Sequence, residues 1–408
     1  MSASPLRVVA IGITPPVFKA SGGISAGIQL TRHVARHCDA RFVLMSTEDS
    51  ETREDGLLVV RRRPANMLRR ASPLLPAKLV SAMWRPALKA WLAATRPAVV
   101  HLHNPHPPGA LAEIAEDCIA LRIPYVISTH GFVEFNDYAS ASNGSSWRRP
   151  IYDRFIRRPV AGVARNAARV LMLSPEETPI LRAMGVQPDR LDVVTNGVDR
   201  YFTETVPSAD RARLIERFNL PRDRPILLFV GNHTPNKGIG VLLRALTQMQ
   251  ENAVAVVAGA MRSQKEHAAL LEGAGLQARD PRLVFTDFTT KDELRALYQT
   301  ADVFVFPSFA DTLPLVVLEA MASGVPVVAT RVGGIPFEVT PDTGVLIEAG
   351  DYRGLAAQLD RLCADPALRR AMGNAGRNRV HDQFSWDASA EKAIGIYRSV
   401  AQQVQGRC

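Results

Sequence analysis

Two carboxylate side chains, Asp311 and Glu319, lie eight positions apart in a stretch that is otherwise mostly apolar. Carboxylate oxygens accept hydrogen bonds, so this pair could contact hydroxyl groups of a ligand. The neighbours of Glu319 favour that function, because they are apolar and a lone buried carboxylate is costly. The pair alone also fits a simpler structure, in which Glu319 is an exposed helix residue and Asp311 caps the helix N-terminus.

The elements around this pair form a strand, helix, strand unit. Four consecutive segments have the composition of a buried strand, a loop, a helix and a second strand: residues 303–306, 308–314, 315–322 and 325–330. In such units, ligands bind beyond the carboxyl ends of the strands. The loop with Asp311 and the first turns of the helix with Glu319 are therefore expected to face a ligand.

A second polar loop follows the apolar run at residues 226–230 and precedes a helix predicted from Val241. This loop, residues 231–238, contains Lys237, whose ammonium group can neutralise a phosphate, and glycines that let backbone N–H groups approach one. Neither half of the chain contains the G-x-G-x-x-G or the G-x-x-x-x-G-K-[ST] pattern. The loop therefore indicates phosphate binding without a dinucleotide-binding or P-loop motif.

Polar residues also follow strands in the first half of the chain. Gly22 and Gly23 come after the first strand, with a helix expected near Ser25, although a glycine pair often marks a simple turn. His130 follows the strand at residues 125–128, where its imidazole could bond a substrate hydroxyl. A lone loop histidine is more often structural, so both functions stay open for His130.

Histidines and cysteines are candidate metal ligands. His101, His103 and His106 are close in sequence, but no acidic or thiol partner is nearby, so no metal site is predicted. The four cysteines are scattered without CxxC or Cys/His spacing. This pattern indicates neither a disulfide framework nor a zinc site and fits a reducing cytosol.

Length and composition indicate an ordinary globular chain with two domains. The chain has 408 residues, of which 47% are hydrophobic and 22% charged. The first residues have the pattern of a short tail and a strand, not of a secretory leader, and no uninterrupted apolar run approaches about 18 residues. A cytoplasmic protein is expected.

The net charge of +9 lies entirely in the first half. Residues 1–200 contain 26 Lys and Arg against 17 Asp and Glu, whereas residues 201–408 contain 23 of each. Much of the excess lies among Arg61, Arg62, Arg63, Arg69, Arg70, Lys78, Arg85 and Lys89, interleaved with Leu74, Leu75, Leu79, Met83, Trp84 and Trp91. Such a segment could hold a helix at an anionic membrane surface, or form a solvated helix whose apolar residues pack inward. Nucleic acid is disfavoured, because no nucleic-acid-binding motif accompanies the charge.

Strand-like and helix-like segments alternate along the chain, which predicts parallel sheets covered by helices on both faces. The strand-like segments of the first half are residues 8–13, 41–45, 99–103, 125–128, 170–173 and 191–194, with helical spacing at 27–37 and 110–121. Those of the second half are residues 226–230, 253–257, 283–286, 303–306, 325–329 and 344–347. A polar segment with Pro207, Pro221 and Pro225 places the boundary near residues 200–205.

Taken in order, the motifs resemble those of the retaining GT-B glycosyltransferases of family 4, over nearly the whole chain. The series is Gly22-Gly23, VVHLHN (99–104), STHG (128–131), TNGVD (195–199), GNHTPNKG (231–238), ADVFVFPS (301–308), DTLPLVVLEAMASGVPVVA (311–329) and GVLIEAGD (344–351). Each motif alone is weak evidence for the family, whereas the ordered series is specific to it. Residues 384–400 are similar to the family's helix that crosses back onto the first domain.

The resemblance implies an α/β fold of two doubly wound, Rossmann-like domains that face each other across a cleft. Residues 1–203 would bind the acceptor, residues 204–383 the nucleotide sugar, and residues 384–408 would form the returning helix. It also implies that Glu319 binds a ligand, which decides between the two interpretations of the carboxylate pair.

The resemblance further implies a role for each candidate residue. Glu319 would bind ribose hydroxyls of a nucleotide sugar, Asp311 hydroxyls of the donor sugar, and His130 the sugar's outer hydroxyl. Lys237 would stabilise the diphosphate as negative charge develops, assisted by backbone N–H groups near Gly23 and Gly334. The nucleotide-binding set would be Gly22, Gly23, Asn232, Lys237, Leu315, Val316 and Glu319, and the catalytic set His130, Lys237 and Asp311.

The reaction implied is transfer of a glycosyl unit from a UDP-, GDP- or ADP-sugar to an acceptor hydroxyl, with retained anomeric configuration. Front-face attack assisted by the leaving phosphate is the usual proposal for the family. The chain contains no D-x-D motif, and no metal or other cofactor is expected, since protein cations replace the metal ion in GT-B enzymes.

Two positions depart from the family pattern. Asn232 stands where an arginine is usual, which removes one cation beside the diphosphate. Arg262 or Arg331, both just after strands, could replace it. Asp311 stands where glutamate is usual, and the shorter carboxylate is expected to alter sugar preference without abolishing activity.

The leading expectation is a cytoplasmic hexosyltransferase for polysaccharide or glycolipid biosynthesis. Its partners would be a nucleotide sugar, a glycan or lipid-linked acceptor and, through the basic first domain, the inner face of an anionic membrane; nucleic acid is not expected. One alternative is transfer to a small soluble acceptor. Another, raised by Asn232, is a nucleotide-sugar-binding protein without transfer activity.

Overall fold

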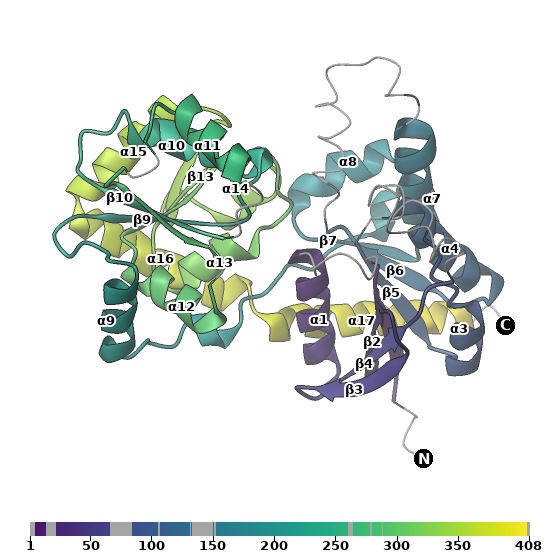
Figure 1. The fold of residues 1–408 in the computed structure, drawn as a ribbon. Coiled ribbons are helices and arrows are strands. Elements are labelled where there is room, and N and C mark those ends of the chain that lie inside the picture. The colour runs from purple at the N-terminus through teal and green to yellow at the C-terminus, as the bar shows by residue number, and fades with distance from the viewer. Residues whose placement is uncertain are drawn as a thin grey trace. The chain divides into compact units, whose positions relative to one another are not determined.

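The computed structural model describes residues 5–13, 22–65, 84–104, 107–130, 132, 150, 152–259, 264–277, 280–287 and 289–405. The chain divides into two compact units after Asn196 and after Ser385. The second division returns the C-terminal segment to the first unit. Figure 1 draws both units as ribbons coloured along the chain.

The first unit contains an eight-stranded sheet in the order β3-β4-β2-β1-β5-β6-β7-β8. Its strands are β1 (Arg7–Gly12), β2 (Asp39–Met45), β3 (Ser50–Glu54), β4 (Leu57–Arg62), β5 (Val99–His103), β6 (Tyr125–Ser128), β7 (Arg169–Met172) and β8 (Leu191–Val193). All neighbouring strands are parallel except β3, which is antiparallel to β4. The predicted doubly wound sheet is therefore present, with an added edge hairpin.

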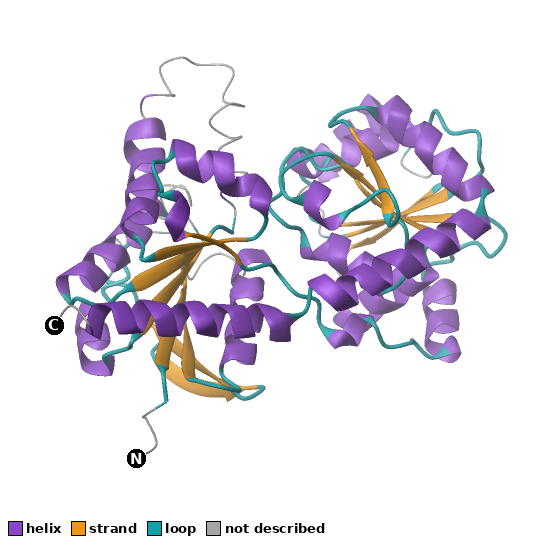
Figure 2. Cartoon of the chain, turned by 180° about the vertical axis from the view of Figure 1, so that it is seen from behind, coloured by secondary structure: helices purple, strands orange, loops and turns teal. Residues whose placement is uncertain are grey.

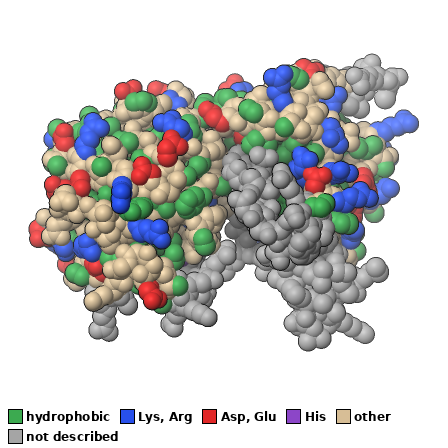
Figure 3. Space-filling view, turned by 90° about the horizontal axis from the view of Figure 1, so that it is seen from above, with side chains coloured by type: hydrophobic (Ala, Val, Ile, Leu, Met, Phe, Trp, Pro, Cys, Tyr) green, Lys and Arg blue, Asp and Glu red, His purple; other side chains and the backbone are tan. Residues whose placement is uncertain are grey.

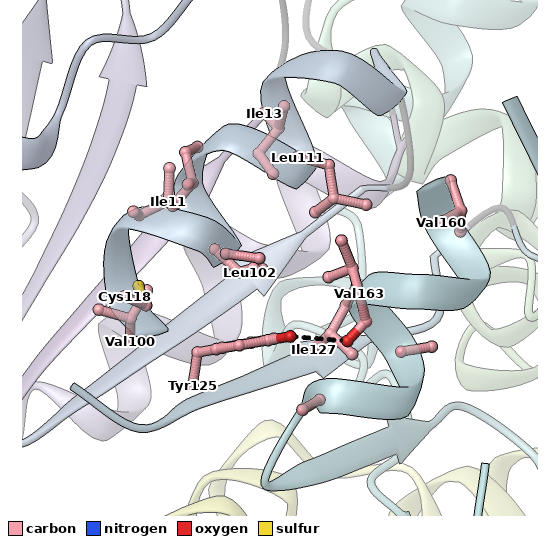
Figure 4. Packing of buried hydrophobic residues seen from close by; sticks show 14 of the residues in the cluster. Ile11, Ile13, Val100, Leu102, Leu111, Cys118, Tyr125, Ile127, Val160 and Val163 are labelled. Atoms are coloured by element: carbon pink, nitrogen blue, oxygen red, sulfur yellow. Dashed lines mark hydrogen bonds between the residues drawn. The ribbon is translucent and has the colours of Figure 1, made fainter. Parts of the chain in front are cut away.

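Helices cover both faces of this sheet, as Figure 2 shows. They are α1 (Gly22–Val34), α3 (Lys89–Thr95), α4 (Pro108–Ala120), α7 (Arg158–Asn166), α8 (Thr178–Ala183) and α17 (Trp386–Gln405). A dense apolar core fills the space between strands and helices, because residues such as Ile11, Leu102 and Ile127 are fully buried (Figure 4). The Tyr125 hydroxyl donates to the Val163 carbonyl oxygen at 2.8 Å within this core.

The hairpin of β3 and β4 corrects the expectation of a basic helix for Arg61 and Arg62. Both residues lie on β4, and their guanidinium groups form ion pairs with Glu54 at 2.6 Å and Glu51 at 3.0 Å on β3. Strand β3 is exposed along its whole length and has no apolar face. The period-two signal of a half-buried strand was therefore missing from the sequence.

The rest of the basic and aromatic segment is only partly described. Trp84 is buried, and Trp91 packs against the core with the Arg62 guanidinium 5.5 Å from its ring centroid. Arg85 forms a 3.6 Å ion pair with Glu113. Both tryptophans thus face the protein interior. Of the other members, Arg63 follows β4 and Lys89 begins α3. Seven members lie outside the described residues: Arg69, Arg70, Leu74, Leu75, Lys78, Leu79 and Met83.

The second unit contains a six-stranded parallel sheet in the order β11-β10-β9-β12-β13-β14. The strands are β9 (Ile226–Val230), β10 (Val254–Ala258), β11 (Leu283–Asp287), β12 (Val303–Phe306), β13 (Val327–Thr330) and β14 (Gly344–Ile347). The helices are α9 (Ser208–Arg217), α10 (Ile239–Leu246), α11 (Gln264–Gly273), α12 (Lys291–Thr300), α13 (Leu315–Ala322), α14 (Ile335–Glu338), α15 (Tyr352–Ala364) and α16 (Pro366–Gln383).

The strand order decides which loops meet in the second unit. Strand β12 lies between β9 and β13, and all three run in the same direction. The polar loops that follow them therefore lie side by side at one edge of the sheet. In the sequence, Lys237 of one loop and Asp311 of the next are 74 positions apart.

Helix α17 packs in the first unit, as predicted for the C-terminal segment. Its Asp387 accepts from Arg36 at 2.8 Å, and its Tyr397 hydroxyl lies 2.7 Å from His101 Nδ1. Within the described residues, no helix combines the length and apolarity that crossing a bilayer would require. Charged side chains of both signs are interspersed on the described surface in Figure 3.

Candidate functional site

The second unit brings Lys237 and Asp311 into contact. Lys237 ends the short 3-10 turn Pro235–Lys237 after β9, and Asp311 lies in the loop after β12. Lys237 Nζ is 2.5 Å from Asp311 Oδ2, which also accepts from Ser308 Oγ at 3.2 Å. Asp311 is buried, whereas the Lys237 side chain is partly exposed.

Gly238 allows the two loops to approach this closely. It has a φ of 72°, and a Cβ at this position would lie 1.8 Å from the Pro307 carbonyl oxygen. Ser308 Oγ and the Phe309 N–H both donate to the Asn236 carbonyl oxygen, at 3.0 and 2.8 Å. Only glycine can occupy position 238, because a side chain would force the phosphate loop away from Asp311.

Glu319 lies on α13 and is hydrogen-bonded to a tyrosine that sequence reasoning did not identify. The Tyr298 hydroxyl of α12 donates to Glu319 Oε2 at 2.9 Å. Burial raises the pKa of Glu319 to about 7, partly opposed by the Tyr298 hydrogen bond and the positive charge of Lys291. The Glu319 side chain is half-buried. With a pKa of about 7, it changes charge near neutral pH.

The simpler interpretation of the carboxylate pair is wrong. The residue that caps α13 is Pro314, without a side-chain cap, and Asp311 bonds Lys237 instead. Leu315 and Val316 form the first turn of α13, where backbone N–H groups have no intrahelical acceptor. These N–H groups and the helix dipole favour an anion at this end.

Four further residues have predicted roles near the diphosphate. The Gly334 N–H already donates to the Thr312 carbonyl oxygen at 2.8 Å. Asn232 is exposed, and Arg331 is 3.5 Å from Glu348 in an exposed ion pair. Arg262 lies outside the described residues, so the replacement of the usual arginine stays a prediction.

Glu338 is a further acidic residue that sequence reasoning missed. Its side chain is fully buried, and neither carboxylate oxygen has a hydrogen-bond partner within the described part of the chain. Burial raises the pKa of Glu338 well above its ordinary range, and the charge of Asp311 raises it further. Arg379 donates to the backbone oxygen of Glu338 at 2.9 Å and to that of Phe337. The only sequence signal was an acidic residue directly after the apolar GGIPF run.

The first unit brings Gly23, Asn104 and His130 together. Helix α1 begins at Gly22, three residues earlier than predicted, so both glycines lie in its first turn. A Cβ on Gly23 would lie 2.7 Å from Asn104 Oδ1 and 2.8 Å from His130 Cβ. Asn104 has a φ of 77° and was named in the sequence only as part of a motif. Gly131, which follows His130, lies outside the described residues.

Two of the three candidate metal-ligating histidines, His101 and His103, lie on β5. His101 and His103 are fully buried with ring centroids 3.9 Å apart, and His106 lies outside the described residues. Among the residues that the structure describes, no group of three or more His, Cys, Asp or Glu side chains is arranged to hold a metal ion.

Comparison with solved structures identifies the fold. The chain superposes on sucrose-phosphate synthase of Thermosynechococcus elongatus with a TM-score of 0.75 and 24% identity, over 97% of this chain and 99% of that one. Anabaena Alr3699/HepE in complex with UDP-glucose gives a TM-score of 0.72 and 18% identity, over 98% and 100%. Together with the two sheets, these likenesses show a GT-B fold.

Sequence comparison identifies the family. The model of Glycosyltransferase Family 4 matches residues 23–201, and that of Glycosyl transferases group 1 matches residues 210–379. An alpha-maltose-1-phosphate synthase of Mycobacterium tuberculosis is 33% identical, over 76% of this chain and 80% of that protein. A D-inositol 3-phosphate glycosyltransferase of Xylanimonas cellulosilytica is 36% identical, over 60% of each. The chain belongs to the group 1 glycosyltransferases of family 4 and is a glycosyltransferase.

Proposed function

We propose that this protein is a retaining glycosyltransferase that moves a hexosyl unit from a UDP-, GDP- or ADP-sugar to an acceptor hydroxyl in polysaccharide or glycolipid biosynthesis. The observation that carries the proposal is the contact between Lys237 and Asp311 at the carboxyl ends of neighbouring strands. A cation for the diphosphate and an acceptor for sugar hydroxyls then lie side by side. Glu319, on the helix that follows, would bind the ribose hydroxyls.

The positions of these groups support a separate role for each of them in binding the donor. The Lys237 ammonium would neutralise charge that builds up on the diphosphate as the bond to the sugar breaks. Asp311 holds that ammonium in place and is itself held by Ser308, so little reorganisation is needed when the donor binds. The first N–H groups of α13, at Leu315 and Val316, would add partial positive charge. These groups would supply the charge that the proposed metal-independent reaction requires.

In the proposed reaction, the bond between the sugar's anomeric carbon and the diphosphate oxygen breaks. The acceptor oxygen forms a new bond to the same face of that carbon. The acceptor's proton passes to a phosphate oxygen of the leaving nucleoside diphosphate, so atoms and charges balance. The anomeric configuration of the donor is retained in the product.

The direct test is to incubate the protein with a panel of nucleotide sugars and acceptors and determine the anomeric configuration of the product by NMR. An α-configured donor should give an α-linked product, together with slow donor hydrolysis when no acceptor is present. An inverted product would refute retention. Donor binding without transfer or hydrolysis would favour the alternative of a binding protein, which Asn232 raises.

The second part of the proposal is the acceptor class. One specific alternative competes with a glycan or lipid-linked acceptor. The names of the two relatives and of the sucrose-phosphate synthase each contain a sugar or polyol phosphate. A small phosphorylated acceptor is therefore a second candidate for this chain. Turnover with soluble sugar phosphates but not with glycan or lipid-linked acceptors would select it.

Contact with an anionic membrane is a separate proposal, supported by the charge excess of residues 1–200. Sedimentation with vesicles of anionic and of neutral lipid tests it. The protein should sediment with anionic vesicles at low salt and dissociate as salt screens the charges. Protein that stays in the supernatant with both vesicle types would exclude membrane contact.

Donor affinity should depend on pH through Glu319. Its pKa of about 7 lies above the ordinary value, so the side chain is mostly protonated at pH 6 and mostly ionised at pH 8. The ionised form accepts both ribose hydroxyls, so donor affinity should rise about tenfold from pH 6 to pH 8 and then level off. Calorimetry with a nucleotide sugar measures this, because its phosphates do not titrate in that range.

The matched control for the pH experiment is Glu319→Gln, which keeps the side-chain shape and removes the titrating group. Its affinity should be lower and independent of pH between 6 and 8. Affinity in the unsubstituted protein that stays flat, or that falls with rising pH, would exclude an ionised Glu319 as the ribose-binding group.

A further inference from the structure

Three imidazole rings, called the histidine stack, contact one another in series inside the first unit. His101 and His103 lie on β5 with ring centroids 3.9 Å apart, and His130, after β6, lies 5.5 Å from His103. The first pair is tilted by 40° and the second pair is stacked. The exposed fractions of the three side chains are 0%, 0% and 6%. Only the outermost, His130, has a proposed contact with substrate, so the two inner rings need an explanation.

Of the three histidines, His103 is the hardest to explain as a residue that only fills the core. Neither of its ring nitrogens has a hydrogen-bond partner among the described residues. Leaving buried polar groups unpaired costs about 1–3 kcal/mol each, and an apolar side chain of similar size would avoid that cost. Packing is also tight, because a Cβ on Gly27 of α1 would lie 2.8 Å from His103 Cγ. The ring therefore sits between its two histidine neighbours at a cost in stability.

His101 anchors the inner end of the stack. Its Nδ1 lies 2.7 Å from the Tyr397 hydroxyl of α17, and its Nε2 lies 2.8 Å from Ser128 Oγ on β6. A hydroxyl can donate or accept, so these two partners satisfy both nitrogens of a neutral imidazole in either tautomer. Tyr397 thus links the C-terminal helix to the histidine stack.

Burial keeps all three rings uncharged. It lowers the pKa of His101 to about 3 and that of His130 to about 4, and that of His103 lies well below its ordinary range. A proton on one ring would also repel a proton on the next. His130 is therefore a neutral hydrogen-bonding group at physiological pH, whose usefulness depends on where its ring is held.

We infer that His101 and His103 are positioning residues, which hold the His130 imidazole in place for the donor sugar and are themselves held by Tyr397 of α17. This inference rests on the proposed function of His130. The path runs from α17 through His101 and His103 to His130, and every step is a contact within one unit. A displaced His130 should slow transfer while nucleotide binding, which does not involve His130, stays unchanged.

Tyr397→Phe tests the anchor, with Tyr125→Phe as a matched control. Both tyrosines are 2% exposed in the same unit, and both hydroxyls make one short bond, to His101 Nδ1 and to the Val163 carbonyl oxygen. Each variant should lose a similar amount of thermal stability. Only Tyr397→Phe should lower kcat, by about fivefold, with the Kd for the nucleoside diphosphate unchanged. Equal kcat in both variants would overturn the inference.

His103→Met tests the inner ring by separating stability from activity. Methionine has a similar volume and adapts to an irregular space, so the variant should melt at the same or a higher temperature. We expect kcat to fall about tenfold or more, because His130 loses its stacking partner. If the role of His103 were purely structural, the His103→Met variant would instead lose stability or keep its kcat. Either result would contradict the inference.

Imidazole NMR provides a readout that requires no turnover. The His130 signals, assigned by their loss in His130→Asn, should shift in Tyr397→Phe and stay fixed in Tyr125→Phe. Unchanged His130 signals in Tyr397→Phe would refute the coupling even if the protein proved inactive. If the signals shift but a nucleotide sugar does not perturb them, the stack positions His130 and the proposed sugar contact is wrong.

Discussion

Replacing Lys237 with alanine should lower kcat by about 10²–10³-fold, the effect usually seen when one fixed group that stabilises a developing negative charge is removed. Lys237 Nζ is 2.5 Å from Asp311, and the pair lies where a diphosphate and its sugar would meet. The change should appear mainly in kcat, because charge on the diphosphate increases as the glycosyl bond breaks. Steady-state kinetics with the best donor of the panel measures it.

Arg282→Ala is the matched control for Lys237→Ala. Arg282 pairs with Asp280 at 2.9 Å, and the side-chain exposures of 33% and 12% are close to the 24% and 11% of Lys237 and Asp311. This pair precedes β11, at the opposite end of the sheet from the site. Both variants should lose stability, and only Lys237→Ala should lose turnover. Similar kcat values in the two variants would remove Lys237 from the reaction.

Replacing Glu319 with alanine should weaken donor binding by at least about 10²-fold. Hydrogen bonds to a charged group contribute about 1.5–3 kcal/mol each, and the carboxylate is expected to accept two from the ribose. Nucleoside diphosphate and nucleotide sugar should be affected equally, because the ribose is common to both. Calorimetry at pH 8, where Glu319 is ionised, gives the largest difference from the unsubstituted protein.

Ser323→Ala controls for loss of a buried hydrogen bond on the same helix. Ser323 caps the C-terminal end of α13, and its hydroxyl donates to the Phe202 carbonyl oxygen at 3.2 Å. The variant should be destabilised by about 1 kcal/mol and bind the donor normally. If Glu319→Ala binds the donor as tightly as Ser323→Ala, the ribose lies elsewhere.

The elements that position the site followed from local sequence. Helix α13 and strand β12 have the predicted bounds, and the β-branched runs of the central strands predicted two parallel sheets. These strands are buried on both faces, which produces continuous apolar runs that are visible without tertiary information. Strand β3 of the edge hairpin was missed because it is exposed along its length and carries no apolar pattern.

The ordered series of motifs also indicated the family from the sequence alone. Each motif is a short polar segment after a strand, and the rule that ligands bind at carboxyl ends placed Lys237, Asp311, Glu319 and His130 near a ligand. Sequence could supply the chemical type of each group and the end of the sheet on which it lies. It could not supply which groups touch.

Tertiary structure decided those contacts, because they join residues that are far apart in the chain. The bond between Lys237 and Asp311 depends on β12 lying beside β9, and the bond between Tyr298 and Glu319 on the packing of α12 near α13. The histidine stack requires His103 and His130 to meet across neighbouring strands, with Tyr397 supplied by the last helix. Periodicity records which face of an element is buried, whereas register and strand order, which arise from packing of the whole unit, determine what each buried group meets.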